Sequence, residues 1–283
     1  MAVLIERARA KINLTLRVRG RRADGYHDLD SLVAFAALAD RLALEPGPGI
    51  DLVVSGPRAA ACGPAADNLV LVAAAQARAR IAGLILGRFT LDKRLPAAAG
   101  IGGGSADAAA ALRLIARANA LSPDDSRLMD AARATGADVP VCLVSRASRM
   151  RGIGDELQPV AWPRIAAVLV NPGVAVATRD VFGALGLKAG ETLAADENMN
   201  CAPLTPTGLA AGRNDLEPVA VGLQPVIGDV LAALRATGCV LARMSGSGAT
   251  CFSLYADGRS ALSAAHALRR AHPAWWVRAS VIG

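Results

Sequence analysis

The chain has 283 residues, of which 53% are hydrophobic, and its formal net charge is +7. That length is enough for one large or two modest domains with buried cores. No apolar stretch is long and uncharged enough to predict a transmembrane helix. Charged residues are mixed with apolar ones at the start of the chain, whereas a secretory signal separates the two, so we expect a cytoplasmic protein with no membrane partner.

The charge and the cysteines narrow the function classes further. Arginine carries almost all of the positive charge, because Lys11, Lys93 and Lys188 are the only lysines. A positive field attracts polyanionic substrates and also nucleic acids. The few aromatic residues make a poor base-stacking surface, however, so we expect no nucleic-acid partner. The five cysteines are scattered, which indicates free thiols and excludes the spacing of a metal site or a disulfide framework.

In chain order, the first predicted element is a strand over residues 10–18, where apolar and polar residues alternate. A period of two would place Lys11 and Asn13 together on the polar face of that strand. Tyr26 and His27 follow in a turn-rich stretch, where ordinary hairpin residues are the simpler interpretation. The pattern also predicts strands over 31–44, 50–54 and 88–92.

A glycine-rich loop after Lys93 is the most informative feature of the first half. Gly100 and residues 102–104 free the backbone to approach a ligand, and Ser105 opens an alanine-rich helix that ends near Asn119. Unpaired N–H groups and the helix dipole at such a helix start suit phosphate oxygens. A flexible loop with a helix cap fits the same residues, and neither the Walker nor the Rossmann spacing is present.

Helix signals occur on both sides of this loop. Asp67 or Asn68 is predicted to cap a helix that runs to about Gly83. Ser122, with a proline directly after it, predicts the start of another helix, which ends at residues 135–136.

Two further features are candidates for chemistry. Asp138 precedes an apolar run, where an N-cap aspartate is the simpler interpretation of that residue alone. Residues 245–248 form a second glycine–serine loop between two predicted strands. Two such loops in separate halves, together with a lysine and an acid, suggest a phosphate channel at a domain interface. We place the domain boundary near 160–163, which gives domains 1–160 and 161–283.

The second half predicts a compact α+β unit. Thr178 is expected to cap a helix that carries Phe182. Residues 198–212 have little periodic signal and are the best candidate for a mobile loop. The remaining predicted elements are strands over 165–170, 239–243, 251–255 and 275–280, and helices over 215–221, 225–237 and 260–271.

Six short motifs occur in order along the chain. They are A-K-I-N-L from Ala10, D-G-Y-H-D-L from Asp24, L-P-A-A-A-G-I-G-G-G-S-A-D-A-A-A from Leu95, T-G-A-D-V-P from Thr135, N-D-L-E-P from Asn214 and M-S-G-S-G-A-T-C-F from Met244. In content and order they resemble the GHMP kinase superfamily, and within it a branch that acts on a cytidine diphosphate substrate. The resemblance spans residues 8 to about 255. It implies an α+β, two-domain GHMP kinase fold with the active site in the cleft between the domains.

The resemblance also implies an activity and a set of site residues. The activity is ATP-dependent phosphorylation, with Mg²⁺, of the 2-hydroxyl of a methylerythritol group on a small-molecule cytidine diphosphate substrate, in isoprenoid precursor biosynthesis. Lys11 and Asp138 would be catalytic, which agrees with general chemistry, because a carboxylate can accept the hydroxyl proton and an ammonium can offset developing charge. The ATP phosphates would bind at Pro96, Ala97, Ala98, Ala99, Gly100, Ile101, Gly102, Gly103, Gly104, Ser105 and Ala106. The substrate would bind at Asn13, Tyr26, His27, Phe182, Gly246, Ser247 and Gly248.

Several alternatives stay open. Another small-molecule kinase of the superfamily, acting on homoserine or a mevalonate derivative, would share the glycine loop, although Tyr26 and His27 favour a cytidine nucleotide. A serine hydrolase is disfavoured, because neither Ser105 nor Ser247 has the flanking glycines of a nucleophile elbow. The sequence assigns no side chains to Mg²⁺. It is compatible with a monomer or a homodimer.

Overall fold

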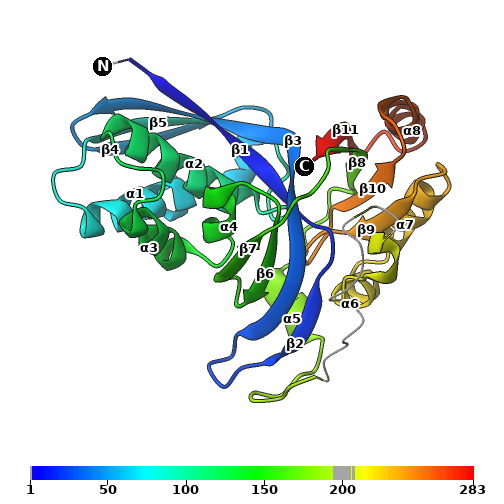
Figure 1. Ribbon diagram of the computed structural model, residues 1–283. Helices are drawn as coiled ribbons and strands as arrows, with labels where there is room; N and C mark the ends of the chain where they lie inside the picture. The colour runs from blue at the N-terminus through cyan, green and yellow to red at the C-terminus, as the bar shows by residue number, and fades with distance from the viewer. Residues whose placement is uncertain (1, 194–204, 206–207) are drawn as a thin grey trace. The chain divides into compact units, whose positions relative to one another are not determined.

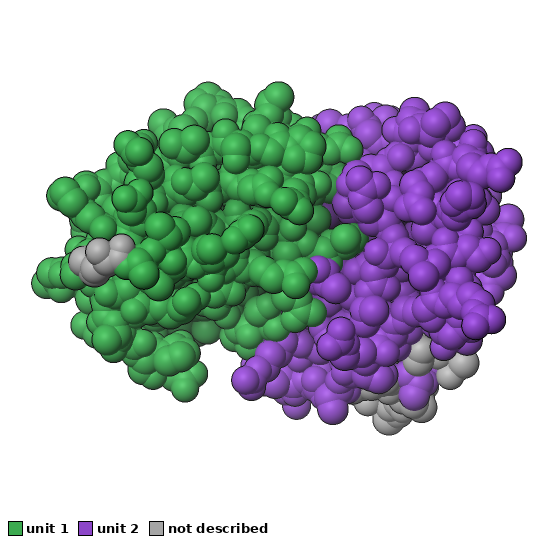
Figure 2. Space-filling view, turned by 90° about the horizontal axis from the view of Figure 1, so that it is seen from above, with its two compact units in different colours: residues 1–11, 38–97, 102–145 green, residues 12–37, 98–101, 146–283 purple. Residues whose placement is uncertain are grey.

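The structure is a computed structural model that describes residues 2–193, 205 and 208–283 (Figure 1). The chain forms two compact units (Figure 2). Unit 1 comprises residues 1–11, 38–97 and 102–145, and unit 2 comprises residues 12–37, 98–101 and 146–283. Both units are therefore discontinuous along the chain. The boundary expected near 160–163 stays a prediction.

Unit 1 combines a small sheet with four helices. Strand β4 (Ile50–Ser55) pairs in parallel with β5 (Leu86–Asp92), which pairs antiparallel with the second half of β3 (His27–Gly47). Helix α1 (Leu69–Arg80) packs against β4, and helix α2 (Gly103–Ala118) packs against β5 (Figure 1). Helix α2 is rich in alanine, and its small buried side chains let α1 and α4 contact it closely. The other elements are β1 (Leu4–Asn13), η1 (Ala59–Cys62), η2 (Ala65–Asp67), α3 (Ser126–Thr135) and α4 (Val139–Val144).

Unit 2 is built on an antiparallel sheet, whose strands after β3 are, in spatial order, β11 (Trp276–Ile282), β8 (Ile165–Asn171), β10 (Cys251–Tyr255) and β9 (Leu241–Met244). Strand β8 is an almost uninterrupted buried apolar run, as expected for a strand with neighbours on both sides. Helices α7 and α8 contact each other and this sheet, so they cover the same face. The remaining elements are α5 (Thr178–Gly183), η4 (Gly208–Ala211), α6 (Glu217–Leu223), α7 (Val226–Arg235) and α8 (Gly258–Ala271).

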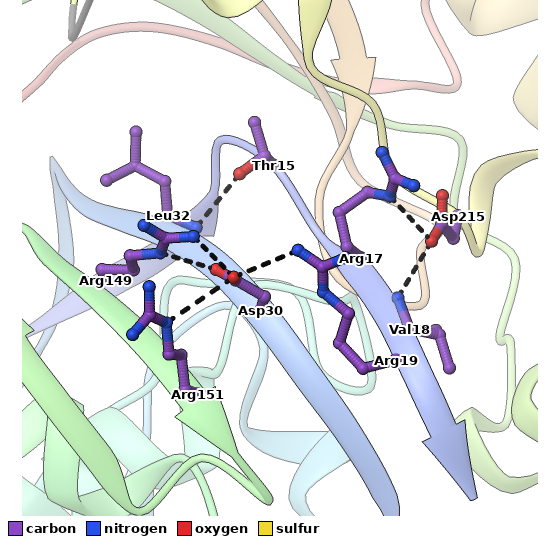
Figure 3. A network of polar contacts seen from close by, with 9 residues as sticks. All are labelled: Thr15, Arg17, Val18, Arg19, Asp30, Leu32, Arg149, Arg151 and Asp215. Carbon is purple, nitrogen blue, oxygen red and sulfur yellow. Dashed lines mark hydrogen bonds and ion pairs between the residues drawn. The ribbon is translucent and has the colours of Figure 1, made fainter. Parts of the chain in front are cut away.

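Three shorter strands extend unit 2 around the first half of β3. Strands β2 (Arg17–Arg21) and β6 (Ser148–Gly152) both pair antiparallel with β3, and β7 (Glu156–Pro159) pairs with β6. Asp30 of β3 lies among arginines of both neighbours (Figure 3). Its carboxylate accepts hydrogen bonds from Arg149 Nε at 2.8 Å and Nη2 at 2.6 Å, and Arg19 Nη2 and Arg151 Nε lie 3.5 Å and 3.6 Å away.

The structure confirms most of the predicted elements. Strands lie at 50–55, 165–171 and 251–255, and Asn68 caps α1 by accepting a hydrogen bond from the Val70 N–H at 3.0 Å. The four cysteines within the described ranges are free thiols. No helix in the described part of the chain combines the length and hydropathy of a membrane span.

Three local predictions were wrong. The strand expected over residues 10–18 is interrupted between β1 and β2, and its polar side chains are buried instead of facing solvent. Helix α3 is capped by Asp125, because its carboxylate accepts the Arg127 N–H, so the helix begins four residues after Ser122. Helix α5 begins at Thr178 with Ala177 as its N-cap.

The strands β6 and β7 were not predicted. Most of the expected mobile loop over 198–212 lies outside the described residues. Its described part contains the short helix η4.

Candidate active site

Lys11 and Asp138, the two residues predicted as catalytic, form an ion pair in unit 1. Lys11 Nζ donates to Asp138 Oδ2 at 2.8 Å. The Lys11 side chain is 5% exposed and that of Asp138 is 35% exposed. A buried ammonium requires a counter-charge, and Asp138 supplies it. The pair therefore combines a sheltered cation with a carboxylate that solvent or a ligand can reach.

Asp138 does not act as the cap that its sequence position suggests. It occupies the N-cap position of α4, but its side chain accepts no capping hydrogen bond from that helix. The carboxylate is engaged with Lys11 instead, so the N-cap interpretation was wrong.

Gly102 is the point where the glycine loop contacts Lys11. Its φ is +60°, in the left-handed region that favours glycine, and it is the N-cap residue of α2. A Cβ at this position would lie 3.2 Å from Lys11 Cε and 3.3 Å from Lys11 Cβ. Only glycine therefore lets the loop pass the lysine side chain without displacing it.

The start of α2 offers backbone donors directly after Gly102. The Ala106 N–H donates to the Gly102 carbonyl oxygen at 2.8 Å, which is the first hydrogen bond of the helix. The N–H groups of Gly103, Gly104 and Ser105 precede that bond and have no acceptor within the helix. Such donors and the positive end of a helix dipole suit phosphate oxygens, and phosphate binding at this loop stays a prediction.

In unit 2 the middle of the glycine loop is held by the second glycine–serine loop. The Ser245 hydroxyl donates to the Gly100 carbonyl oxygen at 2.9 Å and accepts the Asn13 N–H at 3.0 Å. The Thr250 N–H donates to the Ala99 carbonyl oxygen at 3.1 Å. Gly100 has φ +71°, and a Cβ there would collide with the Ser245 carbonyl oxygen. The two motifs, far apart in sequence, are thus fitted to each other.

Asn214 is a site residue that sequence reasoning did not single out. Its Nδ2 donates to the carbonyl oxygens of Met244 at 2.9 Å and Gly246 at 2.8 Å, and it is 3% exposed. It therefore fixes the backbone of the second glycine–serine loop. Its presence in the N-D-L-E-P motif was the only available signal.

Asn13, predicted to bind substrate, presents an unused acceptor. Its Nδ2 donates to Ser31 Oγ at 2.7 Å, whereas its buried Oδ1 has no hydrogen-bond partner within the described residues. A Cβ on Gly246 would lie 3.4 Å from that oxygen. Buried acceptors are normally satisfied. Asn13 Oδ1 is therefore suited to accept a hydrogen bond from a ligand hydroxyl beside the second loop.

His27 and Phe182, also predicted to bind substrate, lie ring against ring. Their centroids are 4.6 Å apart and the rings are tilted by 32°. Burial and then the charge of Arg21 lower the pKa of the His27 imidazole, which favours its neutral form. Its Nε2 is buried without a hydrogen-bond partner within the described part of the chain. Tyr26, in contrast, is exposed.

Thr178 connects this aromatic pair to the second loop. Its hydroxyl lies 2.9 Å from Ser247 Oγ, and it is the first residue of α5, which carries Phe182. Sequence reasoning assigned Thr178 only to a cap, so this contact was missed.

Among the described residues, clustered metal-ligating side chains are absent. No group of three or more His, Cys, Asp or Glu residues is placed to hold a metal ion within the described ranges.

The chain is similar to known proteins of one family. Residues 68–146 match the model of the GHMP kinases N terminal domain, and residues 198–274 match that of the GHMP kinases C terminal domain. A 4-diphosphocytidyl-2-C-methyl-D-erythritol kinase of Rhodopseudomonas palustris is 60% identical over 287 residues, covering 98% of this chain and 96% of the relative. A kinase of the same name from Nitrobacter hamburgensis is 58% identical, with coverage of 99% and 95%.

Solved structures show the same likeness. A crystal structure of 4-(cytidine 5'-diphospho)-2C-methyl-D-erythritol kinase has a TM-score of 0.79 and 36% identity, covering 99% of both chains. A homoserine kinase from Cytophaga hutchinsonii has a TM-score of 0.73 at 19% identity, covering 99% of this chain and 95% of its own, and that likeness shows a shared fold alone. The predicted α+β, two-domain fold class is confirmed.

Proposed function

We propose that this chain, which belongs to the GHMP kinase family, transfers the γ-phosphoryl group of ATP to the 2-hydroxyl of 4-diphosphocytidyl-2-C-methyl-D-erythritol. The products are the 2-phosphate and ADP, in the non-mevalonate route to isoprenoid precursors. The observation that carries the chemistry is the Lys11–Asp138 ion pair packed against Gly102. Relatives with this substrate in their names, at 54–60% identity over nearly the whole chain, support the substrate.

In the proposed mechanism the Lys11–Asp138 pair accepts a proton and stabilises negative charge. The 2-oxygen of the substrate forms a bond to the γ-phosphorus as the bond between that phosphorus and the β–γ bridging oxygen breaks. Asp138 accepts the hydroxyl proton and later releases it to solvent. The Lys11 ammonium keeps the carboxylate paired and offsets negative charge on the transferring group. Phosphoryl transfer depends mainly on such positioning and charge stabilisation, so no covalent nucleophile is required.

ATP is proposed to bind at Pro96–Ala106, with the N–H groups at the start of α2 as phosphate donors. Mg²⁺ is proposed to accompany the nucleotide, where phosphate oxygens, water and the Ser105 hydroxyl would hold it. ATP use in biosynthesis agrees with the expected cytoplasmic location. A monomer or a homodimer, with no nucleic-acid partner, stays the expectation.

The substrate is proposed to bind through residues of unit 2. Cytosine would stack with His27 and Phe182, and the neutral His27 imidazole can donate or accept a hydrogen bond at its edge. Asn13 Oδ1 would accept from a substrate hydroxyl, because that buried oxygen has no partner within the described residues. Tyr26 and residues 246–248 complete the proposed contacts.

A coupled ADP-release assay tests the proposal. It uses Mg²⁺-ATP and 4-diphosphocytidyl-2-C-methyl-D-erythritol, with Asp138→Asn and Lys11→Met as site variants. Each should lower kcat by at least about 10²-fold, the usual loss for a single charge-stabilising group. Asp130→Asn and Lys188→Met, at exposed positions, are matched controls and should keep wild-type rates. Turnover of homoserine or a mevalonate compound, with none of the cytidine substrate, would contradict the proposed substrate and leave the kinase chemistry in place.

A further inference from the structure

A buried charge network of unit 1 lies beneath the glycine loop and takes no direct part in the proposed chemistry. Lys93 Nζ donates to Asp40 Oδ2 at 2.6 Å and to Asp107 Oδ2 at 2.6 Å. The three side chains are at most 4% exposed. They come from three elements, since Asp40 lies on β3, Lys93 directly follows β5 and Asp107 lies on α2.

Asp40 holds the backbone that leads into the glycine loop. Its Oδ1 accepts the N–H groups of Arg94 at 2.6 Å and Leu95 at 2.8 Å, the two residues that precede Pro96. One carboxylate thus fixes the backbone at the entrance to the loop and, through its other oxygen, holds Lys93.

Asp107 links Lys93 to helix α2, which follows the glycine loop. It lies two residues after Ser105, close to the N–H groups at the start of α2. A Cβ on Gly103 would lie 3.3 Å from Lys93 Nζ, so the ammonium also packs against the first helical residue. Lys93 therefore joins the entrance of the loop to its exit through its bonds to Asp40 and Asp107.

A buried network of this kind costs free energy of folding, so its presence points to a use for the geometry that it imposes. Burying two carboxylates and one ammonium has a large desolvation penalty, and well-packed apolar groups often stabilise a fold equally well. Burial by itself would lower the pKa of Lys93, but the charges of Asp107 and Asp40 outweigh it and raise the pKa, so the bridge stays charged. Asp107 Oδ1 has no hydrogen-bond partner among the described residues, so the network is not fully satisfied either.

We infer that Lys93 is a positioning residue for ATP: by joining Asp40 and Asp107 it sets the spacing between the loop entrance and the backbone donors of α2. The inference rests on the proposed function, because it assumes that those donors bind the ATP phosphates. Donors that lose their alignment bind phosphate less well, and a shift of about 1 Å in such a group can cost up to 10²-fold. The residues proposed to hold the cytidine substrate belong to unit 2, and none of the bonds of Lys93 reaches them, so the affinity for that substrate should change much less.

The experiment compares two ligands on two variants by isothermal titration calorimetry and steady-state kinetics. Lys93→Met removes the bridge and leaves the carboxylates of Asp40 and Asp107 without their shared counter-charge. Lys93→Met combined with Asp107→Asn removes one negative charge as well, and Asp40 keeps its two backbone N–H partners. We therefore expect this double variant to stay folded, so that a loss of ATP affinity in it is not caused by unfolding. Lys188→Met is the control for loss of a lysine.

Both variants should bind a non-hydrolysable ATP analogue at least about tenfold more weakly, with a matching rise in the KM for ATP. The affinity for the cytidine substrate should stay within twofold. Wild-type affinity for the analogue in the double variant, or an equal loss for both ligands, would overturn the inference. If the wild type binds the analogue but does not phosphorylate the cytidine substrate, the proposed substrate fails while the comparison of ATP affinities still decides the role of Lys93.

Discussion

The Ser245 hydroxyl donates to the Gly100 carbonyl oxygen at 2.9 Å, and this bond joins two glycine motifs that are 145 residues apart in the sequence. Ser245 is fully buried and also accepts the Asn13 N–H. Its single hydroxyl therefore satisfies one acceptor and one donor of the main chain at once. A substitution at either end of this hydrogen bond therefore affects both glycine motifs.

Ser245→Ala should destabilise the protein through these two main-chain groups. Each would be left buried without its partner, so the free energy of unfolding should fall by about 1–3 kcal/mol. Chemical denaturation measures the change. Ser263→Ala, on an exposed position of α8, is the control and should change stability little. Equal stability of the two variants would show that the Ser245 bonds are replaced by water.

Gly102→Ala should reduce activity more than its backbone strain explains. Gly238 has a similar positive φ, +74°, but nothing lies within 4 Å of a Cβ there, so Gly238→Ala measures strain alone. Both variants should lose roughly 1–2 kcal/mol of stability, the cost of a left-handed alanine. Only Gly102→Ala displaces the Lys11 side chain, so only its kcat should fall, by about tenfold or more. Similar kcat values in the two variants would contradict the contact between Gly102 and Lys11.

Asp30→Asn should destabilise unit 2 and change its acid response. Burial by itself would raise the pKa of Asp30, but the Arg149 hydrogen bond and the charges of Arg149, Arg151 and Arg19 outweigh it and lower the pKa. A lowered pKa contributes stability above the ordinary Asp value, and this stability is lost as the pH falls through the folded-state pKa. The variant should therefore lose about 1–3 kcal/mol at pH 7 and less below pH 4.

Denaturation of wild type and Asp30→Asn at pH 7 and pH 3.5 tests this. A difference that is constant with pH would mean that the ion pairs contribute nothing beyond packing. Asp51→Asn, whose carboxylate pairs with Arg88 at an exposed site, is the control and should change stability by less than about 1 kcal/mol.

Asp107→Asn should remove a pH dependence of the opposite sign. Burial raises the pKa of Asp107 to about 7, and the nearby Asp40 charge adds to this against the opposing effect of Lys93. The folded protein therefore binds a proton here that the unfolded chain has already lost between about pH 4 and 7, so wild-type stability falls as the pH rises through that range. The asparagine variant lacks this fall. Unfolding free energies at pH 5 and pH 8 measure it, and a parallel fall in both proteins would exclude Asp107 as the cause.

Much of the fold follows from patterns that are local in the sequence. The buried run of β8 and the cap of α1 by Asn68 each depend on a few adjacent residues, and both were predicted correctly. The predicted start of α3 was wrong because two capping residues, Ser122 and Asp125, lie close together in the sequence. Asp125 is the cap in the structure, because its carboxylate accepts the Arg127 N–H. Strand β6 was missed because five residues with alternating arginines resemble an exposed loop as closely as a strand.

The site was predictable only where a motif marks it. Lys11 and Asp138 were paired through a family resemblance, since nothing local shows that a carboxylate at an N-cap position bonds to a lysine 127 residues away. Asp40, Lys93 and Asp107 were not connected for the same reason. Their bonds join positions that are 53 and 14 residues apart, and only the folded backbone brings them together.

The place of strand β11 in the sheet limits when the sheet of unit 2 can form during synthesis on the ribosome. It pairs with β8 along its whole length and with β3 at Ile282, and the main chains of Phe35 and Gly283 exchange two hydrogen bonds. Every other strand of unit 2 is synthesised before it. The edges of β3 and β8 that pair with β11 therefore cannot complete this pairing until residues 276–282 emerge from the exit tunnel, and until then they are exposed strand edges.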